Sequence, residues 1–470
     1  MLNNSQHLHP FVTTGTNERS RLQKLAFFDQ VFMVKLRYYS ILAGGLLALM
    51  LPALADQPAA LTPQFNLSLS DAFSRADAQN PQLLAVARSL DINQGDITIA
   101  GAVPNPQIGV QYGFGTIATE QGNPQQVGIT QTIELGGKRD ARLQVAAAQY
   151  QLTSLQLTAL RWTIHTQVRR AYAELAAAEA AVEAVNAQVK LADQVVDIAR
   201  KRVEVGVAPA AELLQAKLAR TQLDTQTTQA QGRVQNARTQ LNSLLGEDPQ
   251  PTAQVRDRGL FNLRIEKTEL VPTPDAPMPG VENLLQQAYN LRPDLRALLQ
   301  QAQVAQNQVR LADAQRTPDL QVGVAYAFTT YTNGNAQGSG FIPSVGLTVP
   351  LFYNQGGEIA KARAIFDQVG LQNKALRQQI ATDVRTAYQS MTAARENIRK
   401  YQTRLLPDST EVLSLAQESY QVGKTGLTSV IVAQQADQQI RLGYLEAVVA
   451  YQNAWADLEG AVGAPLPISS

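Results

Sequence analysis

The most constraining feature of this 470-residue chain is that its body occurs twice. Landmarks of the first half reappear in the second half in the same order. The difference in sequence position between partners rises only from 212 (293 minus 81) to 217 (463 minus 246). The pairs are Asn80-Pro81 with Arg292-Pro293, Pro106 with Pro318, Tyr172 with Tyr388, Val205-Gly206 with Val422-Gly423, and Gly246 with Gly463. A repeat of this length is one structural unit used twice.

Composition excludes several classes of function. The formal net charge is +1 and no basic or acidic block occurs, so nothing favours nucleic acid as a partner. The chain has no cysteine, which removes disulfides and thiolate metal sites. Nucleophile motifs, a phosphate-binding loop and paired metal ligands are also missing from the sequence. We therefore predict that the chain is not an enzyme and uses no cofactor.

Residues 1–55 read as a targeting region. Basic residues precede an apolar run, and Ala53 and Ala55 supply the small side chains that a signal peptidase reads. The run is shorter than the about 20 apolar residues that a membrane-spanning helix needs. We expect cleavage after Ala55. Because residues 1–32 are polar and carry no pattern, we also expect translation to start at Met33; a long leader is the alternative.

Each copy reads as a helix, two strands, a very long helix and a returning helix. The first helix should run from Leu67 to about Gly101, with Ser70 as its N-cap and a break at Asn80-Pro81. A proline-rich linker with little regular structure should separate the copies. The predicted segments are a first repeat at 66–246 with its β-hairpin at 107–134, a linker at 247–280, a second repeat at 281–463 with its hairpin at 319–351, and a tail at 464–470.

The predicted strands alternate large apolar residues with small or polar ones, so each has one apolar and one wet face. Each strand is about 10 residues long, the length of a tilted transmembrane strand. Aromatic residues gather at the strand ends, as in interfacial girdles. We predict that the apolar set faces lipid; a soluble sandwich is the alternative. The set is Ile108, Val110, Tyr112 and Phe114 in the first hairpin, and Val322, Val324, Tyr326, Val345, Leu347 and Val349 in the second.

The helix that follows the first hairpin is unusually long. Between Lys138 and Val205 it should hold 68 residues (205 minus 138, plus one), or roughly 100 Å at 1.5 Å per residue. Apolar residues and alanines recur at heptad spacing from Ile164 to Val203, as in a coiled coil. The second copy repeats this pattern with an interruption at Pro407-Asp408. Four strands cannot close a membrane barrel, so we predict that the chain oligomerises to form a barrel continuous with a helical tunnel.

These features resemble TolC-type outer-membrane efflux proteins over nearly all of the chain that follows the leader. The resemblance rests on four sequence motifs: Pro104-Asn105-Pro106, Glu134-Leu135-Gly136-Gly137-Lys138-Arg139, Pro350-Leu351-Phe352 and Tyr420-Gln421-Val422-Gly423-Lys424-Thr425-Gly426. The second motif is similar to the one found in the branch of the family that serves cobalt-zinc-cadmium cation efflux pumps. The resemblance implies an α+β membrane protein, in which a long α-helical coiled-coil barrel continues a transmembrane β-barrel completed by trimerisation.

The same resemblance implies a place in the cell and a set of partners. We expect an outer-membrane protein that extends into the periplasm and conducts substrate from an inner-membrane RND-type pump through a periplasmic adaptor. Heavy-metal cations are the expected cargo, and multidrug efflux or type I protein secretion is the alternative within the family. A soluble periplasmic coiled-coil scaffold is the alternative of another class.

By resemblance, the two glycine turns should be periplasmic tips that dock the adaptor; the plain alternative is a helical hairpin with a glycine C-cap. Glu212 stands at the family's acidic position, six residues after the first tip glycine, whereas the second copy has Ser429 there. We predict a gate in which Glu212 pairs with Lys424 of the neighbouring tip. The alternative is a solvated carboxylate, since exposed pairs contribute about 0–1 kcal/mol. The expected docking residues are Val205, Gly206, Val207, Val422, Gly423 and Lys424.

Metal-binding residue types are scarce after the leader. One histidine, His165, and two methionines, Met278 and Met391, follow residue 55. Soft and borderline metals need clustered His, Cys or Met ligands. We therefore predict no metal site in this chain, place any cation selection in the pump, and take His165 for an ordinary helix-surface residue.

Overall fold

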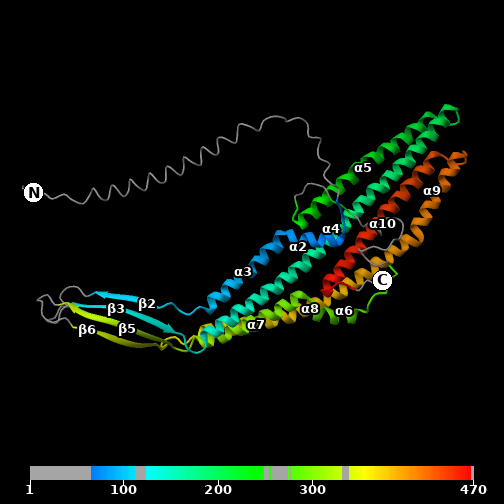
Figure 1. The fold of residues 1–470 in the computed structure, drawn as a ribbon. Helices are drawn as coiled ribbons and strands as arrows, with labels where there is room; N and C mark the ends of the chain where they lie inside the picture. Colours follow the sequence, from blue (N-terminus) through cyan, green and yellow to red (C-terminus); the bar gives the residue numbers. More distant parts are fainter. Residues whose placement is uncertain are drawn as a thin grey trace, which may run out of the picture. The chain divides into compact units, whose positions relative to one another are not determined.

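The two copies contribute matching elements in the order that the repeat predicts (Figure 1). The computed structural model describes residues 65–112, 123–247, 253–255, 274–275, 277–330 and 338–466, which fall in the unit Pro63–Ser470. The leader and Phe114 lie outside the described residues. The first copy holds α2 Leu69–Gln79, α3 Pro81–Gly101, β2 Gln107–Tyr112, β3 Asn123–Ile133, α4 Lys138–Glu204 and α5 Ala210–Leu245. The second holds α6 Val281–Leu291, α7 Pro293–Ala314, β5 Asp319–Thr330, β6 Ser339–Thr348, α8 Gly356–Lys400, the π-helical η3 Tyr401–Leu405, α9 Leu406–Gln421 and α10 Leu427–Val462.

The first helix has a different cap from the one predicted. Ser68, not Ser70, is the N-cap of α2, because Ser68 Oγ accepts a hydrogen bond from the backbone N–H of Asp71 at 3.1 Å. The Asp71 carboxylate accepts the N–H of Ser68 in return, which completes a capping box. The break at Asn80-Pro81 is as expected: Asn80 caps α3, and Pro81 takes its first position.

The four long strands form one antiparallel sheet in the order β2-β3-β5-β6. Directly paired residues point to the same face of a sheet. One face is therefore apolar across the strands, with rows such as Val110–Val127–Tyr326–Phe341 and Ile108–Ile129–Val324. The other face carries small and polar residues, with rows such as Gly109–Gly128–Ala325 and Gln111–Gln126–Ala327, apart from Ile342, which pairs with Ala325. The alternation predicted from the sequence thus produces two chemically opposite faces.

The second hairpin ends earlier than predicted. β6 stops at Thr348, so Val349 lies just beyond the strand. The reason is the register: Thr348 pairs with Asp319, where β5 begins, and later residues have no partner strand among the described residues. Among the described strands, β2 and β6 are the two edges of the sheet, because each pairs with one neighbour only.

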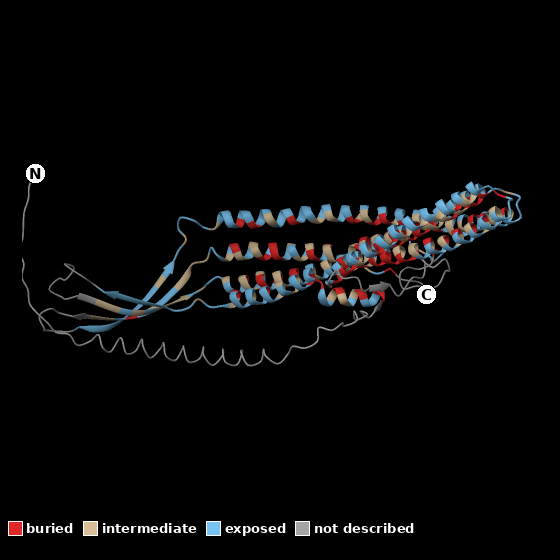
Figure 2. Cartoon of the chain, turned by 90° about the horizontal axis from the view of Figure 1, so that it is seen from above, coloured by how far each residue is buried: buried red, intermediate tan, exposed pale blue. Residues whose placement is uncertain are grey.

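The core lies in the helices: Figure 2 shows the buried residues along the helices and mostly exposed strands. The main core cluster draws most of its residues from α4, α8 and α10. The heptad positions predicted for α4 are all buried or half-buried, including Ile164, Val168 and Ala199. α4 packs against α5 and α10 in one row, and α10 against α8 and α9. Nearer the sheet, the row is α3-α4-α7-α8. None of the helices in the described parts of the chain has the length and apolar character of a membrane span.

The second long helix differs from the first by a π-helical turn. The sequence positions of Tyr172 and Val205 differ by 33 (205 minus 172), whereas those of their counterparts Tyr388 and Val422 differ by 34 (422 minus 388). A π turn accommodates one extra residue in an α-helix, and η3 lies within this interval. The predicted interruption at Pro407 is therefore a π turn, with the proline itself in the first turn of α9.

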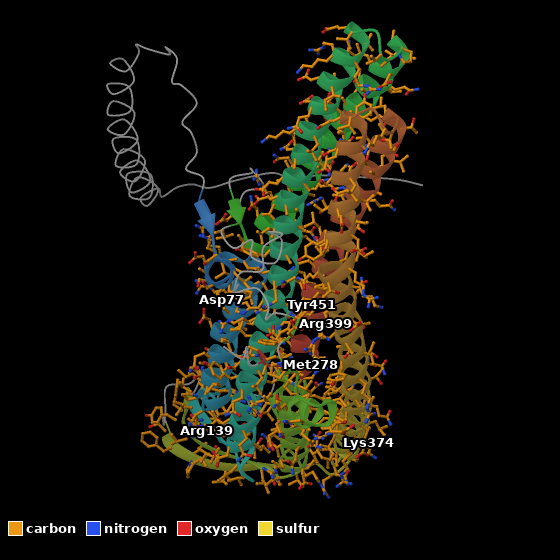
Figure 3. The ribbon with its side chains drawn as sticks, turned by 90° about the vertical axis from the view of Figure 1, so that its right-hand side faces the viewer. Asp77, Arg139, Met278, Lys374, Arg399 and Tyr451 are labelled. Atoms are coloured by element: carbon orange, nitrogen blue, oxygen red, sulfur yellow. The ribbon has the colours of Figure 1, made fainter. Side chains whose placement is uncertain are left out.

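The described residues of the linker between the copies include one short strand and several contacts with the rest of the chain. Its β4 Ala253–Val255 pairs in parallel with β1 Phe65–Leu67. Further along, Arg399 of α8 donates two hydrogen bonds to Asp275, at 3.0 and 2.7 Å. Met278 packs on the core cluster that contains Tyr451 (Figure 3). The described residues of the linker thus pair with β1 at one end and contact the helical core at the other.

Candidate functional site

The two predicted tips share one backbone geometry. At the end of α4, Gly206 has φ +76° and its N–H donates to the carbonyl of Val203, while the N–H of Val207 reaches back to Arg202. At the end of α9, Gly423 repeats the same φ and the same pair of bonds. This is the Schellman motif, which favours glycine because its backbone is left-handed. Each tip thereby exposes a valine, Val205 or Val422, to solvent.

Glu212, Arg202 and Tyr420 form a network that joins the two tips. The hydroxyl of Tyr420, at the end of α9, donates to Oε1 of Glu212 at 2.5 Å. Nε of Arg202, at the end of α4, lies 3.3 Å from the same oxygen. The guanidinium also stacks over the Tyr420 ring, 4.9 Å from its centroid. Three helices from both repeats therefore converge on one carboxylate.

The tip network is largely shielded from solvent, since the Tyr420 side chain is buried and Arg202 and Glu212 are mostly covered. Burial, followed by the hydrogen bond to Glu212, raises the pKa of the Tyr420 hydroxyl above its usual value. Tyr420 therefore stays protonated at physiological pH and remains a donor. Its ring belongs to a small apolar cluster with Val195, Ala216 and Val430, which packs the two hairpins together.

The predicted ion pair between Glu212 and Lys424 is not the pair that forms within the chain. The Glu212 carboxylate contacts Arg202 of α4 and Tyr420 of α9 instead. Lys424 is part of the second Schellman turn, through its backbone N–H. Ser429 bonds the carbonyl of Gly426 and serves the start of α10.

A second charged cluster lies where the strands meet the helices, around the Glu134–Arg139 motif. Glu134 forms a bidentate ion pair with Arg142, and the hydrogen bond from Arg142 lowers the pKa of the Glu134 carboxyl. Lys138 donates to Asp319 of the other repeat at 2.7 Å. The motif therefore links the junction of β3 and α4 in the first repeat to the start of β5 in the second repeat.

Gly136 and Arg139 of this motif also have structural roles. Gly136 has φ +69°, and a Cβ there would clash with the side chain of Thr317. Only glycine fits this close approach of the two repeats. Arg139, labelled in Figure 3, donates to the carbonyl of Gly101 at 2.6 Å and so reaches the end of α3.

His165 is more integrated than predicted. Its Nε2 lies 3.0 Å from Asp77 Oδ1, and its ring stacks on Phe73 with centroids 4.6 Å apart. It therefore joins α2 to α4 instead of lying on a free helix surface. Among the residues that the structure describes, no group of three or more His, Asp or Glu side chains could hold a metal ion.

Sequence reasoning found Glu212 and the tip glycines but missed Arg202 and Tyr420. Arg202 sits where a basic residue is common anyway, in the last turn of a helix. The sequence does contain an indication of the role of Tyr420, because this tyrosine takes the place of the apolar residue Val203 of the first repeat (420 minus 217). A polar aromatic at a heptad core position needs a hydrogen-bond partner when it is buried.

The comparisons with known proteins agree with this geometry. A family model described as "Outer membrane efflux protein" matches residues 72–247 and 284–464. The chain is similar to the cobalt-zinc-cadmium resistance protein CzcC of Cupriavidus metallidurans, with 24% identity over 81% of this chain and 86% of that relative. It is also similar to the nickel-cobalt-cadmium resistance protein NccC of Alcaligenes xylosoxydans xylosoxydans, with 25% identity over 72% of this chain and 74% of the relative.

Solved structures show the same fold. The outer membrane protein VceC of Vibrio cholerae aligns with a TM-score of 0.64 at 20% identity, over 84% of this chain and 96% of that one. A membrane protein from Pseudomonas aeruginosa aligns with a TM-score of 0.68 at 18% identity, over 84% and 90% of the two chains. CusC aligns with a TM-score of 0.66 at 17% identity, over 84% and 92%.

Proposed function

Because this chain belongs to the outer membrane efflux protein family, we propose that three copies form the outer-membrane channel of a tripartite efflux system that exports heavy-metal cations. The channel itself performs no chemical reaction. It receives its cargo from an inner-membrane pump of the RND type through a periplasmic adaptor. Multidrug efflux or type I protein secretion is the second candidate, because the same channel architecture serves any cargo that the pump selects.

The observation that carries this proposal is the sheet with opposite faces. Its apolar rows, such as Val110–Val127–Tyr326–Phe341, suit contact with lipid, and its Gly, Ala and Gln rows suit a wet lumen. Four strands fall short of the about 8 that the smallest transmembrane barrels use. A lipid-facing sheet cannot leave its edge groups unpaired. Closure by further copies of the chain removes both difficulties.

The helical hairpins supply the periplasmic part of the proposal. Because α4 alone has 67 residues, it is roughly 100 Å long at 1.5 Å per residue. We assign the tips Val205–Val207 and Val422–Lys424 to adaptor docking. Exposed valines at rigid Schellman turns offer the apolar contact that a partner's helical hairpin needs.

The cargo is proposed from the relatives and not from the chain's own side chains. CzcC and NccC are named for resistance to cobalt, zinc, nickel and cadmium. His165 is tied to Asp77 and Phe73, so it is not free to ligate a passing ion. We therefore assign cation selection to the pump. Deleting the chain should sensitise cells to Co²⁺, Zn²⁺ or Cd²⁺ and not to drugs; the reverse pattern would favour the multidrug alternative.

Planar-bilayer conductance of the detergent-extracted protein, with its mass on native gels, tests the channel itself. We expect a trimer that inserts and passes a small, steady ionic current. A water-soluble monomer or dimer without conductance would favour a periplasmic scaffold and contradict the proposal.

We also propose that the tip network holds the resting channel closed. Replacing Glu212 with alanine removes the acceptor that Tyr420 and Arg202 share, and with it the side-chain hydrogen bond between the end of α9 and the start of α5. We expect single-channel conductance to rise at least several-fold in Glu212→Ala. Lys424→Ala is the matched control, since the bond that Lys424 makes in this turn comes from its backbone. An unchanged conductance in Glu212→Ala, or an equal rise in the control, would remove the network from the gate.

A further inference from the structure

A groove of about 630 Å³ lies among three helices, α4, α5 and α10, between the sheet and the tips. This volume falls within the roughly 300–1,000 Å³ of small-molecule binding sites. Its lining combines apolar residues with a few charged and amide side chains, which is the composition of such sites. The function proposed above makes no use of this groove.

Three charged side chains line the groove: Glu174 of α4, Glu446 of α10 and Arg233 of α5. None of these side chains has an ion-pair or hydrogen-bond partner among the described residues. Two carboxylates and one guanidinium give the groove a net charge of −1 (one minus two). Both carboxylates are therefore available to a ligand, and their excess over Arg233 favours a ligand with one positive charge.

A buried hydrogen-bond acceptor belongs to the same lining. Asn453 of α10 lines the groove, and its Oδ1 is buried without a hydrogen-bond donor among the described residues. Buried polar atoms normally have a partner. A ligand that carries N–H groups would supply the missing donor.

The apolar part of the lining comes mainly from α10, through Leu442, Leu445 and Val449. Leu445 belongs to the main core cluster, and Leu442 and Val449 pack against that cluster. The core therefore holds this apolar wall in place, and the wall offers a contact surface for the hydrocarbon part of a ligand.

The internal repeat does not reproduce the chemistry of the groove. Residues of α8 follow those of α4 with an offset of 216, so the counterpart of Glu174 is Ser390 (174 plus 216). Residues of α10 follow those of α5 with an offset of 217, so the counterpart of Glu446 is Gln229 (446 minus 217). The helix packing that both repeats share therefore does not require these carboxylates. The apolar wall is equally particular to α10, because its counterparts in α5 are Thr225, Thr228 and Gly232.

The groove lies on the side of α4 that faces away from β1 and α2. The hydroxyl of Tyr172 donates to the carbonyl of Leu67, at the end of β1, at 2.8 Å, and His165 contacts Asp77 of α2. Glu174 follows Tyr172 by two residues, which turns its side chain by about 200° around the helix. The segment of β1 and α2 therefore leaves the groove uncovered.

The same side of α4 continues towards the polar face of the sheet. Ala177, which lines the groove, follows Arg142 by five heptads (177 minus 142), so both lie on one stripe of the coiled-coil helix. Arg142 lines a hollow at the strand–helix junction together with Asp319, and Asp319 pairs with Thr348 on the polar face. In the proposed channel the polar face lines the lumen, so the groove opens into the tunnel.

We propose that this groove binds organic cations that combine one ammonium group with an apolar body. The carboxylates of Glu174 and Glu446 attract the ammonium group, and Oδ1 of Asn453 accepts one of its N–H groups. The apolar wall of α10 contacts the hydrocarbon part. The binding site stands on the groove alone, whereas its place in the tunnel rests on the proposed function. A bound cation would narrow the path for other ions.

The probe for the test is monodansylcadaverine, a primary ammonium joined to an apolar fluorescent ring system. Its fluorescence on titration with the detergent-extracted protein gives the Kd. We expect saturable binding to the parent protein and about tenfold weaker binding to the double variant Glu174→Gln with Glu446→Gln. Arg233→Gln should bind the probe more tightly than the parent does, because the variant removes a like charge from the groove.

Two matched controls separate the site from general charge and from the detergent. Glu396→Gln with Glu411→Gln makes the same change of charge at exposed residues of α8 and α9 outside the groove, and should keep the parent's Kd. The neutral analogue N-butyl dansylamide has the same ring system without the ammonium group, and should bind the parent about tenfold more weakly than the probe does.

Equal binding of the probe to the parent and to Glu174→Gln with Glu446→Gln would overturn the site, and so would weaker binding to Arg233→Gln. Neither result would affect the proposed channel. In planar bilayers, the probe should reduce the current of the parent and leave that of the double variant unchanged. Charge-dependent binding without any effect on the current would overturn the lumenal position. The same binding by a protein without conductance would contradict the proposed channel and support the site.

Discussion

At the residue scale, the tip glycines are set by backbone conformation alone. A Cβ at Gly206 would meet no atom within 4 Å, yet its φ of +76° disfavours any other residue. We expect Gly206→Ala to lower the free energy of unfolding by about 1–2 kcal/mol. Gly232 also has open space around it but is helical, so Gly232→Ala should raise stability by about 0.5–1 kcal/mol. Thermal unfolding followed by circular dichroism measures both, and equal effects would contradict the Schellman explanation.

Glu134 gives a pH dependence with a defined sign. Its pKa is lowered by the hydrogen bond from Arg142, so the folded protein holds the carboxylate more strongly than the unfolded chain does. The stabilisation is present above the ordinary pKa of 4.5 and is lost as the pH falls through the lowered value. We expect wild type to unfold at a higher temperature than Glu134→Gln at pH 7.

The difference between these two proteins should shrink as the pH falls below 4.5. Arg88→Gln is a useful companion, because it removes a pair with Asp91 that is mostly exposed and should change little at any pH. A constant gap between wild type and Glu134→Gln down to pH 3 would show that the pair with Arg142 is not the cause.

At this scale, the sequence indicated which residues belong to the site better than it indicated which residues they contact. Glu212 was found because its distance from the tip glycine is a matter of chain order. Its actual partners, Arg202 and Tyr420, could not be derived, because they depend on how the two hairpins pack side by side. The same limit applies to Lys138 and Asp319, which are distant in sequence and meet only through the pairing of β3 with β5.

At the scale of elements, the π turn η3 is explained by one extra residue. The first repeat spans the same interval with an uninterrupted α4, so the π turn is not needed for the fold. Deleting Thr403, an exposed residue of η3, should convert the segment into continuous α-helix. We expect the trimer yield and thermal midpoint of the deletion variant to match or exceed those of the parent.

The matched control deletes Ala187, the counterpart of Thr403 in α4 (403 minus 216). Each deleted residue turns the following helix by about 100°, and α4 has no extra residue to absorb the change. Its buried positions, from Gln188 to Ala199, would then rotate out of the seam. We expect a large loss of folded protein. Similar losses in both deletions would mean that η3 is held by its own contacts.

The sequence predicted the long elements well and the short ones poorly. Heptads repeated over α4, and strict alternation over β5, leave little choice of structure. The pairing of β1 with β4 involves three residues a side and is made by tertiary contact, so no local pattern announces it. The early end of β6 likewise reflects the reach of its partner strand and not its own residues.

At the scale of the whole molecule, the internal repeat explains both which surfaces are buried between the two copies and which of their counterparts stay exposed. Val304 of α7 and Val195 of α4 are buried where the two repeats pack together. Their counterparts in the other repeat, Ile92 of α3 (304 minus 212) and Val412 of α9 (195 plus 217), are exposed. The repeat likewise leaves β2 and β6 at the edges of the described sheet. Neither the heptads nor the strand pattern could reveal this without the burial of the inner counterparts.

The opposite faces of the sheet lead to the last prediction, which concerns assembly in the membrane. Val110 pairs with Val127 on the apolar face, and its neighbour Gln111 pairs with Gln126 on the polar face. A charged side chain on the lipid face of a barrel costs about 2–4 kcal/mol at the bilayer midplane, whereas lumen substitutions mainly alter selectivity. We expect Val110→Arg to reduce the trimer recovered from outer membranes strongly. Gln111→Arg should assemble normally and shift the channel's ion selectivity towards anions, because the added cation would line the lumen; an equal defect in both variants would mean that the faces do not separate lipid from water.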